Sequence, residues 1–474
     1  MQYSIVNFKK LEEGVSFRFD AEFFHPRALL FEKRINGLHG KTIEEYGCTV
    51  VSGPFGSSLT SDAYLKSGIP FVRISDLRDF IIDTNELTYI SPENHVRLSS
   101  SKLNVGDFVL SKVGNTIGIV SIVTPDIGEC NISENNLGIR FPKECAIEDR
   151  KFILAFLNSE VGQIQILRAI SGNAQPKLNV SDAELIRVPI VTPKLIKTIS
   201  DIIDQAIILI GRSKQYYTQA EQTLLSELGL VNWKPKHRLS FVKNFSDTQA
   251  SDRIDAEYFQ PMYDGILEAV KKYRYGFEPV GTLFKQNRSS FKNKPDELYR
   301  YVEISSVNVL SGEIDSLSLI GKELPANAKI KLNNGDLIIS KVRTYRGAVA
   351  IVQDGGLIGS GAFTVLKESE RMNIETAYVY FKSAPILRLS LKYNAGTSYP
   401  VIDDKDILNL PFPLMPEETQ KTIKQRVVEM YDAKALSKRL FDIAKRGVEM
   451  AIEKSEKDAQ NWIDAELKKL SVKL

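Results

Sequence analysis

The feature that most constrains this chain is an internal repeat, in which similar blocks occur twice in the same order. Residues 18–26 read RFDAEFFHP, and residues 253–261 read RIDAEYFQP. Three further pairs follow: FVRISDL at 71–77 with YVEISSV at 301–307, LNVGDFVLSKVGNTIG at 103–118 with LNNGDLIISKVRTYRG at 332–347, and GNAQPKLNVSDAEL at 172–185 with GTSYPVIDDKDIL at 396–408. The separations between partners drift in one direction, from 235 through 230 and 229 to 224 residues. The chain is therefore a tandem duplication with a period of about 230 residues. Solenoid repeats are about 20–50 residues long, so this period indicates two whole domains of one fold.

Within each copy, the hydrophobic pattern predicts a helix, a β-rich stretch and another helix. The first helices are expected just after a proline, at 27–36 and 262–272, and the later ones at 149–171 and 374–393. The strands are short, rich in β-branched residues and separated by turn residues; they are expected at 71–74, 108–112, 118–123 and 137–141, and at 301–304, 337–342, 347–352 and 362–366. In each copy, a Gly-Asp turn feeds a strand that ends in lysine.

Each copy ends in a long helix that begins at a proline, at 193–228 and at 416–454 or beyond. Apolar residues follow three/four spacing along both helices and fall at aligned positions. Two matched seams in one chain predict that the helices pack on each other as an antiparallel coiled coil; the alternative is that each packs only on its own domain. The expected fold is α+β, with an α/β domain at 1–190, a helix at 191–232, a second α/β domain at 233–413, and a helix and tail at 414–474.

Composition excludes several classes of protein. A net charge of +3 excludes an overall basic surface but permits a local basic face. The three cysteines, Cys48, Cys130 and Cys145, have no CxxC spacing, which argues against a disulfide framework or a zinc site and fits a reducing cytoplasm. No metal site is expected from the four histidines, and neither a signal peptide nor a membrane span is predicted.

The sequence also lacks the usual catalytic motifs. It contains no phosphate-binding P-loop, dinucleotide-binding glycine motif, Asp/Asn-Pro-Pro-aromatic tetrapeptide, nucleophile elbow or HExxH pair. The nearest nuclease-like cluster is Pro295-Asp296 with Glu303. It lacks the expected lysine two residues on and fits better as a loop before a strand. We therefore expect a partner protein to carry the chemistry.

The order of these blocks resembles the specificity (S) subunit of type I restriction–modification systems, the HsdS family. The resemblance is carried by DAEFF and DAEYF, by GPFGS at 53–57, by GDFVLSK and GDLIISK, and by the endings RVPIVTPKLIKTI and NLPFPLMPEETQKTI. The second copy departs from it, because the basic stretch at 285–292 stands where GPFGS is expected. The helix junctions also read PKLIK and PEETQ, where the family commonly has a Glu-Gln pair.

The resemblance implies a non-catalytic subunit made of two target recognition domains, each reading one half of a bipartite DNA site. The long helices would set the spacer between the half-sites and dock two methyltransferase subunits, which a restriction translocase then joins. The chain itself would need no cofactor, whereas its partners would use S-adenosylmethionine, ATP and Mg²⁺. Adenine methylation and ATP-dependent cleavage would be the work of those partners.

Side chains that reach bases or phosphates are predicted from residue type and from position next to turns and strand ends. The candidates in the first copy are Ser57, Ser58, Arg73, Lys112, Asn115, Thr116, Asn173, Gln175 and Lys177. Those in the second copy are Arg288, Ser289, Lys292, Lys341, Arg343, Tyr345, Arg346, Ser398 and Tyr399. The loop at 343–346 is the sharpest candidate, because two arginines flank an aromatic residue directly after a strand; the alternative is a solvated hairpin end.

Two other functions remain open from the sequence alone. The chain could be a divergent nuclease or methyltransferase, against which the missing motifs argue. It could also be a non-catalytic, two-headed adaptor that binds proteins rather than DNA. Binding of DNA at low salt, where phosphate contacts are strongest, distinguishes the adaptor from a DNA-reading subunit.

Overall fold

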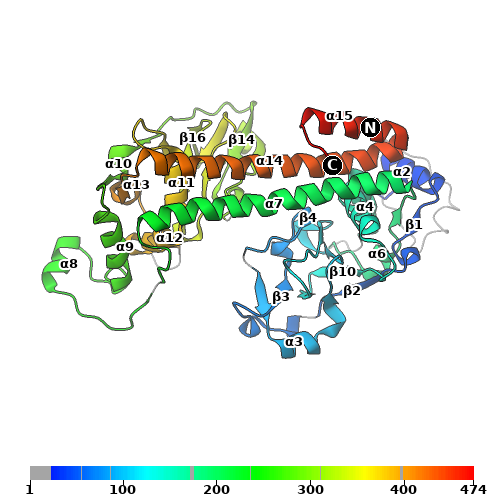
Figure 1. Ribbon diagram of the computed structural model, residues 1–474, viewed down its shortest axis with the longest axis horizontal. Coiled ribbons are helices and arrows are strands. Elements are labelled where there is room, and N and C mark those ends of the chain that lie inside the picture. The colour runs from blue at the N-terminus through cyan, green and yellow to red at the C-terminus, as the bar shows by residue number, and fades with distance from the viewer. Residues whose placement is uncertain are drawn as a thin grey trace. The chain divides into compact units, whose positions relative to one another are not determined.

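The computed structural model describes residues 23–54, 56–85, 87–170, 176–234, 236–309, 311–394 and 399–474. These form two compact units, the first comprising Met1–Gly211 with Ala433–Leu474 and the second comprising Arg212–Asp432. Each unit holds one copy of the repeat and one half of each long helix (Figure 1). The block at 18–26 lies outside the described residues up to position 22.

The first unit contains three small sheets. A five-stranded sheet has the order β2 (Thr49–Ser52), β10 (Asn136–Arg140), β7 (Phe108–Ser111), β8 (Val120–Ile122) and β4 (Phe80–Ile81). A four-stranded sheet has the order β5 (Thr88–Ile90), β3 (Ile69–Val72), β9 (Cys130–Ile132) and β6 (Lys102–Leu103), with β3 and β9 parallel. A two-stranded ladder joins β1 (Lys41–Thr42) to β11 (Arg187–Val188).

The second unit repeats this arrangement, as a duplication requires, except that among the described residues its first sheet has four strands instead of five. Its first sheet runs β13 (Lys285–Gln286), β20 (Phe363–Lys367), β17 (Leu337–Ser340) and β18 (Val349–Ile351). Its second sheet runs β15 (Leu317–Ile320), β14 (Leu298–Val302), β19 (Leu357–Ser360) and β16 (Ala328–Leu332), again with one parallel pair, β14 and β19. The ladder of β12 (Phe277–Pro279) with β21 (Pro411–Pro413) completes the correspondence.

Helices α2 (Pro26–Gly37) and α9 (Pro261–Lys271) begin at a proline as predicted. The prediction of one continuous helix at 149–171 and at 374–393 is wrong, because each is broken by a serine. The first pair is α4 (Ile147–Asn158) and α5 (Glu160–Ala169), and the second is α11 (Ile374–Lys382) and α12 (Ala384–Ser390). Ser159 is extended and its hydroxyl accepts the Gly162 N–H at 3.3 Å, so it caps a new helix.

Shorter helices connect these elements. They are α3 (Pro92–Arg97), α6 (Val180–Glu184), α8 (Phe245–Ser251), α10 (Val280–Leu283) and α13 (Asp404–Asn409).

The long helices α7 (Pro193–Glu227) and α14 (Glu417–Glu453) pack together with antiparallel direction, which confirms the predicted seams. In the first unit, the Ala206 carbonyl accepts the Ser437 hydroxyl at 2.8 Å. In the second unit, the Arg426 guanidinium lies 5.8 Å from the Tyr216 ring, and Leu224 shares a core with Val427. Residues farther along α7 therefore contact residues earlier in α14, as expected for antiparallel helices.

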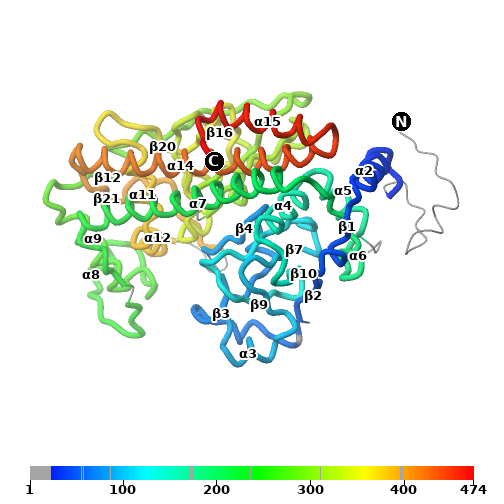
Figure 2. The backbone as a smooth tube through the Cα atoms, turned by 45° about the vertical axis from the view of Figure 1, so that its right-hand side comes forward, coloured from blue at the N-terminus to red at the C-terminus, as the bar shows by residue number. Residues whose placement is uncertain are grey.

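The C-terminal tail forms a further helix, α15 (Glu456–Lys469), whose buried residues belong to the core of the first unit. It runs beside α14 (Figure 2). Its Ile463 comes so close to α14 at Gly447 that a methyl group there would lie 2.7 Å from the Ile463 Cδ1. Glycine at this position therefore permits the tail to join the helix seam.

The repeated DAEFF/DAEYF block has a structural role at its first aromatic residue. Arg168 at the end of α5 donates from Nε to the Phe23 carbonyl at 2.8 Å and lies 4.3 Å from that ring. In the second unit, Lys392 donates to the Tyr258 carbonyl at 2.7 Å and lies 3.8 Å from the Tyr258 ring. The same cationic clamp thus fastens the block in both copies.

No helix among the described residues is both long and apolar enough to cross a membrane. In the same residues, no group of three or more His, Cys, Asp or Glu side chains is placed to hold a metal ion.

Candidate nucleic-acid interface

The Gly-Asp turn in each copy shapes the strand that follows it. Gly106 and Gly335 have φ angles of 88° and 85°, which favour glycine. The Asp107 carboxylate accepts the Asn104 N–H at 2.8 Å and the Phe141 N–H at 3.0 Å, and Asp336 accepts the Asn333 N–H at 2.8 Å. Both aspartates are buried, so the turn is a structural feature rather than a contact surface.

The lysine that ends the strand has a different environment in each copy. Lys112 is 6% exposed, and its Nζ donates to the Ser52 hydroxyl at 2.6 Å. Burial lowers the pKa of Lys112, the nearby Lys177 lowers it further, and Glu134 opposes both. Lys341 instead forms an ion pair with Asp404 at 3.3 Å. The strand-end ammonium therefore lies near a second cation, Lys177, in the first copy. In the second copy it lies next to a carboxylate, that of Asp404.

The last block of each repeat runs alongside the end of this strand. The Leu178 N–H donates to the Lys112 carbonyl at 3.0 Å, and the Ile402 N–H donates to the Lys341 carbonyl at 2.9 Å. This pairing brings exposed Lys177 next to Lys112, which lies 65 residues earlier in the sequence. Asn173, Gln175 and Ser398, three predicted residues of these blocks, lie outside the described residues.

A one-turn 3-10 helix follows the lysine strand in both copies. In the first unit it spans Gly114–Thr116 and exposes Asn115 and Thr116, with the Thr116 hydroxyl 3.2 Å from that of Ser111. In the second unit it spans Thr344–Arg346, where Tyr345 is half-buried and Arg346 is exposed. Both turns place polar side chains at the same point of the fold.

Arg343 precedes this turn in the second unit and is held in an unusual position. Its φ of 50° lies in the left-handed region, and its N–H donates to the Pro400 carbonyl at 2.8 Å. The guanidinium lies 4.7 Å from the ring of Tyr399, which is 67% exposed. Arg343 and Tyr399 therefore form a preorganised cation–aromatic pair at the surface.

The basic stretch of the second copy is connected to the same region. Arg288 donates from Nε to the Gln286 side chain at 2.7 Å, and Gln286 hydrogen-bonds the Asp404 carboxylate. Burial alone would raise the pKa of Asp404, but the Thr364 hydroxyl, the charge of Lys341 and the hydrogen bond from Gln286 together lower it. Arg288 is exposed, so the cluster presents two cations around one carboxylate.

The rest of this stretch follows the edge of β16. The Ser289 carbonyl accepts the Lys331 N–H at 3.0 Å, and Lys292 is exposed. Lys329 and Lys331 are also exposed, and the sequence analysis missed them. Their alternation with apolar residues in AKIKL is the pattern that could have indicated them.

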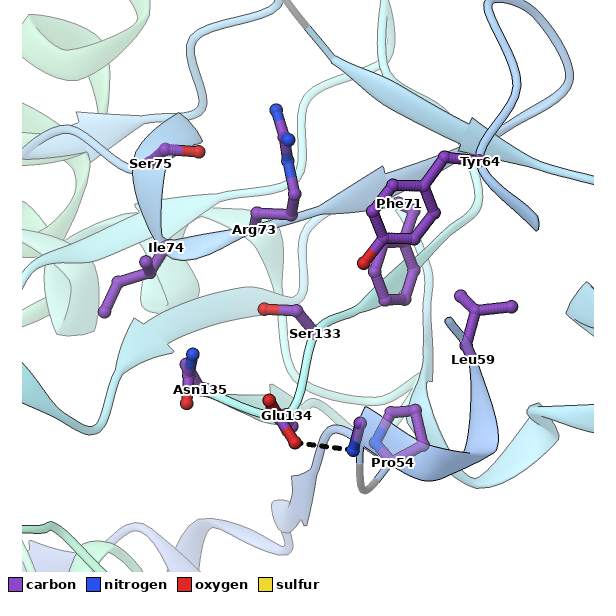
Figure 3. A pocket seen from close by; sticks show the side chains of 11 residues that line it. Pro54, Leu59, Tyr64, Phe71, Arg73, Ile74, Ser75, Ser133, Glu134 and Asn135 are labelled. Carbon is purple, nitrogen blue, oxygen red and sulfur yellow. Dashed lines mark hydrogen bonds between the residues drawn. The ribbon is translucent and has the colours of Figure 1, made fainter. Parts of the chain in front are cut away.

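The first unit has a pocket of about 240 Å³ that the sequence analysis did not predict (Figure 3). The Tyr64 and Phe71 rings, 5.7 Å apart, form one side, and polar side chains form the other. The full lining is Pro54, Gly56, Leu59, Tyr64, Phe71, Arg73, Ile74, Ser75, Ser133, Glu134 and Asn135.

Glycines of the GPFGS segment shape this pocket. The Gly56 N–H donates to the Glu134 carboxylate at 2.5 Å. A methyl group on Gly53 would lie 1.9 Å from the Ser133 carbonyl oxygen, so only glycine permits this close approach. Ser57 belongs to the 3-10 turn Gly56–Ser58, but its side chain is outside the described atoms.

The remaining candidates of the first copy lie at or near this pocket. The Arg73 side chain lines it and forms an ion pair with Asp76 at 3.4 Å. Ser58 is half-buried, and its carbonyl accepts the Arg97 guanidinium at 2.8 Å. Asn135, whose carbonyl accepts the Lys112 N–H at 3.1 Å, connects the pocket to the lysine strand.

Comparison with known proteins gives sequence relatives, although no family model matches the chain. The putative type I restriction enzyme MjaX specificity subunit of Methanocaldococcus jannaschii is 22% identical over 410 residues, which are 84% of this chain and 87% of that protein. The type I restriction enzyme EcoBI specificity subunit of Escherichia coli is 30% identical over 126 residues, about a quarter of each chain.

Among solved structures, the S subunit of a type I restriction–modification system from M. genitalium is 12% identical with a TM-score of 0.40, covering 88% of this chain and 95% of that one. The similarity to the M. jannaschii protein extends over most of both sequences. The expected resemblance is thereby confirmed, and this chain is a relative of the specificity subunits of type I restriction enzymes.

Proposed function

We propose that this chain recognises the DNA target of a type I restriction–modification complex, with each repeat reading one half of a bipartite site. One observation carries the proposal. In both units, the lysine strand, the 3-10 turn after it and the last sequence block converge on one surface, as the pairings of Lys112 with Leu178 and of Lys341 with Ile402 show. The scaffold is the same in both copies and the exposed side chains differ, which suits two different half-sites.

The side chains at these surfaces fit nucleic-acid contacts. Arginine is the side chain that most often reads guanine in the major groove, and lysine neutralises phosphates. Tyr399 holds the Arg343 guanidinium in place, which reduces the conformational entropy lost when DNA binds. In the first unit, exposed Lys177 supplies positive charge beside the largely buried Lys112, and Arg73 at the pocket supplies a further donor.

The long helices would fix the spacing between half-sites and dock the methyltransferase subunits, two in number. At a rise of 1.5 Å per residue, the 35 residues of α7 extend about 50 Å, the length of about 15 base pairs. Restriction and translocation subunits would join this assembly. Those partners would use S-adenosylmethionine, ATP and Mg²⁺, and this chain would be non-catalytic.

The proposal is tested by long-read methylome sequencing of the host with and without this gene. One bipartite methylated motif should disappear when the gene is deleted and return when it is restored. The purified chain should bind DNA weakly alone, and adding the methyltransferase subunit with S-adenosylmethionine should protect that same motif. A methylation pattern that is unchanged after deletion would exclude this function.

A further inference from the structure

The reading domain of each unit is its part outside the long helices α7 and α14, and in each reading domain one helix ends at a serine and the next begins directly after it. A helix that begins after such a break has backbone N–H groups that need an acceptor. At the start of α5, the Ser159 hydroxyl accepts the Gly162 N–H. In α12 the second residue is Pro385, which has no N–H. Both helices still begin with a donor that these features do not satisfy, the N–H of Glu160 or of Ala384.

A glutamate of a long helix accepts this N–H in both units. In the first unit, the Glu449 carboxylate of α14 accepts the Glu160 N–H at 2.8 Å. In the second unit, the Glu221 carboxylate of α7 accepts the Ala384 N–H. Burial raises the pKa of Glu221, against the opposing effects of this hydrogen bond and of Lys382. Each cap therefore joins the reading domain of one repeat to the long helix that ends the other repeat.

The Glu449 side chain is itself held in place. It is 13% exposed, and its second carboxylate oxygen accepts the Arg446 guanidinium at 3.0 Å. The same guanidinium pairs with Glu453 at 3.0 Å. Because both oxygens of Glu449 are engaged, the cap fixes the start of α5 against α14.

Each reading domain also forms an ion pair with the long helix that follows it in the chain. In the first unit, Lys151 of α4 pairs with Asp204 of α7 at 2.6 Å. In the second unit, Glu375 of α11 pairs with Lys424 of α14 at 3.2 Å. Lys151 and Glu375 both lie eight residues before the serine at the break, so the ion pair is reversed in sign between the repeats. The cap keeps its chemistry in both repeats, and it is the contact that the two units share.

The two contacts restrain rotation of the reading domain on the helix pair. Apolar burial is non-directional, whereas a hydrogen bond requires a particular distance and angle. One additional base pair between two half-sites moves the second half-site by about 3.4 Å and turns it by about 35° around the duplex. A reading domain can follow that change only by turning on its helices, which breaks the cap.

We propose that Glu449 and Glu221 are positioning residues that hold each reading domain at one angle on the helix pair, and so restrict the spacing between half-sites that the chain accepts. The inference rests on the proposed function, because it requires a bipartite site. It assigns one such residue to each repeat, and in each case the residue lies on the long helix of the other repeat.

The test measures spacing tolerance with the assembled methyltransferase complex of the same system. The methylated motif gives the native spacer, and competition binding compares duplexes with that spacer, with one base pair fewer and with one more. Glu449→Ala should reduce the preference for the native spacer about tenfold, the factor that one charged hydrogen bond contributes to an equilibrium. Glu449→Gln should retain the preference, because its amide oxygen still accepts the Glu160 N–H. Asp442→Ala, at a residue on the same helix whose side chain is 58% exposed, is the matched control and should also retain it.

Glu221→Ala tests the second repeat independently and should show the same loss. The two alanine substitutions together should multiply their effects, because the caps lie in different units. Glu449→Asp keeps the charge on a shorter side chain; it should lose the preference as well, and it replaces the alanine variant if that variant does not assemble.

A wild-type preference for the native spacer in the Glu449→Ala and Glu221→Ala complexes would overturn the inference and leave the proposed function intact. An equal loss in Glu449→Gln would also overturn it, because the charge beside Arg446 would then be responsible rather than the cap. So would a wild-type complex that recognises both half-sites and accepts all three spacers equally. A wild-type complex that recognises no bipartite site would instead refute the proposed function.

Discussion

Removal of the Arg343 guanidinium should alter recognition by the second repeat only. The structure limits the effect of this change on folding. Alanine and arginine both carry a Cβ, so they share the cost of the left-handed conformation at φ 50°. The stacking lost against partly exposed Tyr399 is worth about 0.5–1 kcal/mol. A domain of this size should then lose only about 1–4 °C in Tm.

The effect on binding should be larger than the effect on folding. A bidentate base contact is worth about 1–3 kcal/mol, so Arg343→Ala should weaken binding of the cognate site about 5–150-fold. Arg343→Gly removes the same guanidinium and also relieves backbone strain of about 1 kcal/mol. The glycine variant should therefore lose recognition to the same extent at an unchanged or higher Tm.

The assay is competition binding of the assembled methyltransferase complex to duplexes with one altered half-site each. Both Arg343 variants should stop discriminating changes in one half-site and continue to discriminate changes in the other. Lys112→Ala in the first repeat is the matched control and should affect the opposite half-site. Equal loss of discrimination at both half-sites would refute the hypothesis that each repeat reads one half-site. Normal recognition by the glycine variant would show that the Arg343 guanidinium is not needed to read the second half-site.

Three further perturbations test the scaffold and the first repeat. Gly53→Ala should lower the Tm and weaken recognition of the first half-site alone, because its methyl group would lie 1.9 Å from the Ser133 carbonyl oxygen. Calorimetry measures the Tm, and the same competition assay measures the recognition. Lys392→Met should cost about 1.5–3 kcal/mol by removing a buried charged hydrogen bond to the Tyr258 carbonyl, and an unchanged Tm would contradict the clamp. Burial and Lys177 lower the pKa of Lys112, so its positive charge is lost as pH rises through a value below that of an ordinary lysine, about 10.4. First-half-site affinity should fall over that range in an anisotropy titration, and Lys112→Arg, which stays charged, should abolish the fall.

Much of the fold was predictable because the duplication and the spacing of apolar residues can both be recognised in the sequence. The paired blocks predicted that the second unit has the same fold as the first. The three/four spacing of apolar residues predicted that α7 packs on α14. The breaks at Ser159 and Ser383 were missed, because a serine inside an apolar pattern does not change its period. Gly162 could have indicated the first break, since a methyl group there would lie 2.1 Å from the Phe156 carbonyl oxygen.

The candidate interface was only partly predictable. Residue type and position next to a strand end indicated Lys112, Lys341 and Arg343. Lys112 and Lys341 do lie at equivalent points of the two units, and Arg343 lies where the first unit has Gly114. Their partners come from distant segments, such as Asp404 for Lys341 and Ser52 for Lys112, and no local pattern encodes those pairs. The pocket was missed for the same reason, because its aromatic residues and Glu134 belong to separate strands and loops.

The two copies show which positions such a scaffold can vary without losing its fold. The buried turn aspartates and the cationic clamp on the DAEFF/DAEYF block occur in both units. The positions around the lysine change their chemistry. Exposed Lys177 corresponds to half-buried Val401, and half-buried Val180 at the start of α6 corresponds to half-buried Asp404 at the start of α13.

These exchanges alter the charge next to the strand end and leave the strand registers intact. A Lys177→Val substitution would remove one cation from the first unit, and Asp404→Val would leave Lys341 without its carboxylate partner. Specificity can therefore diverge between repeats by substitutions at the strand ends, while the buried contacts hold the scaffold constant.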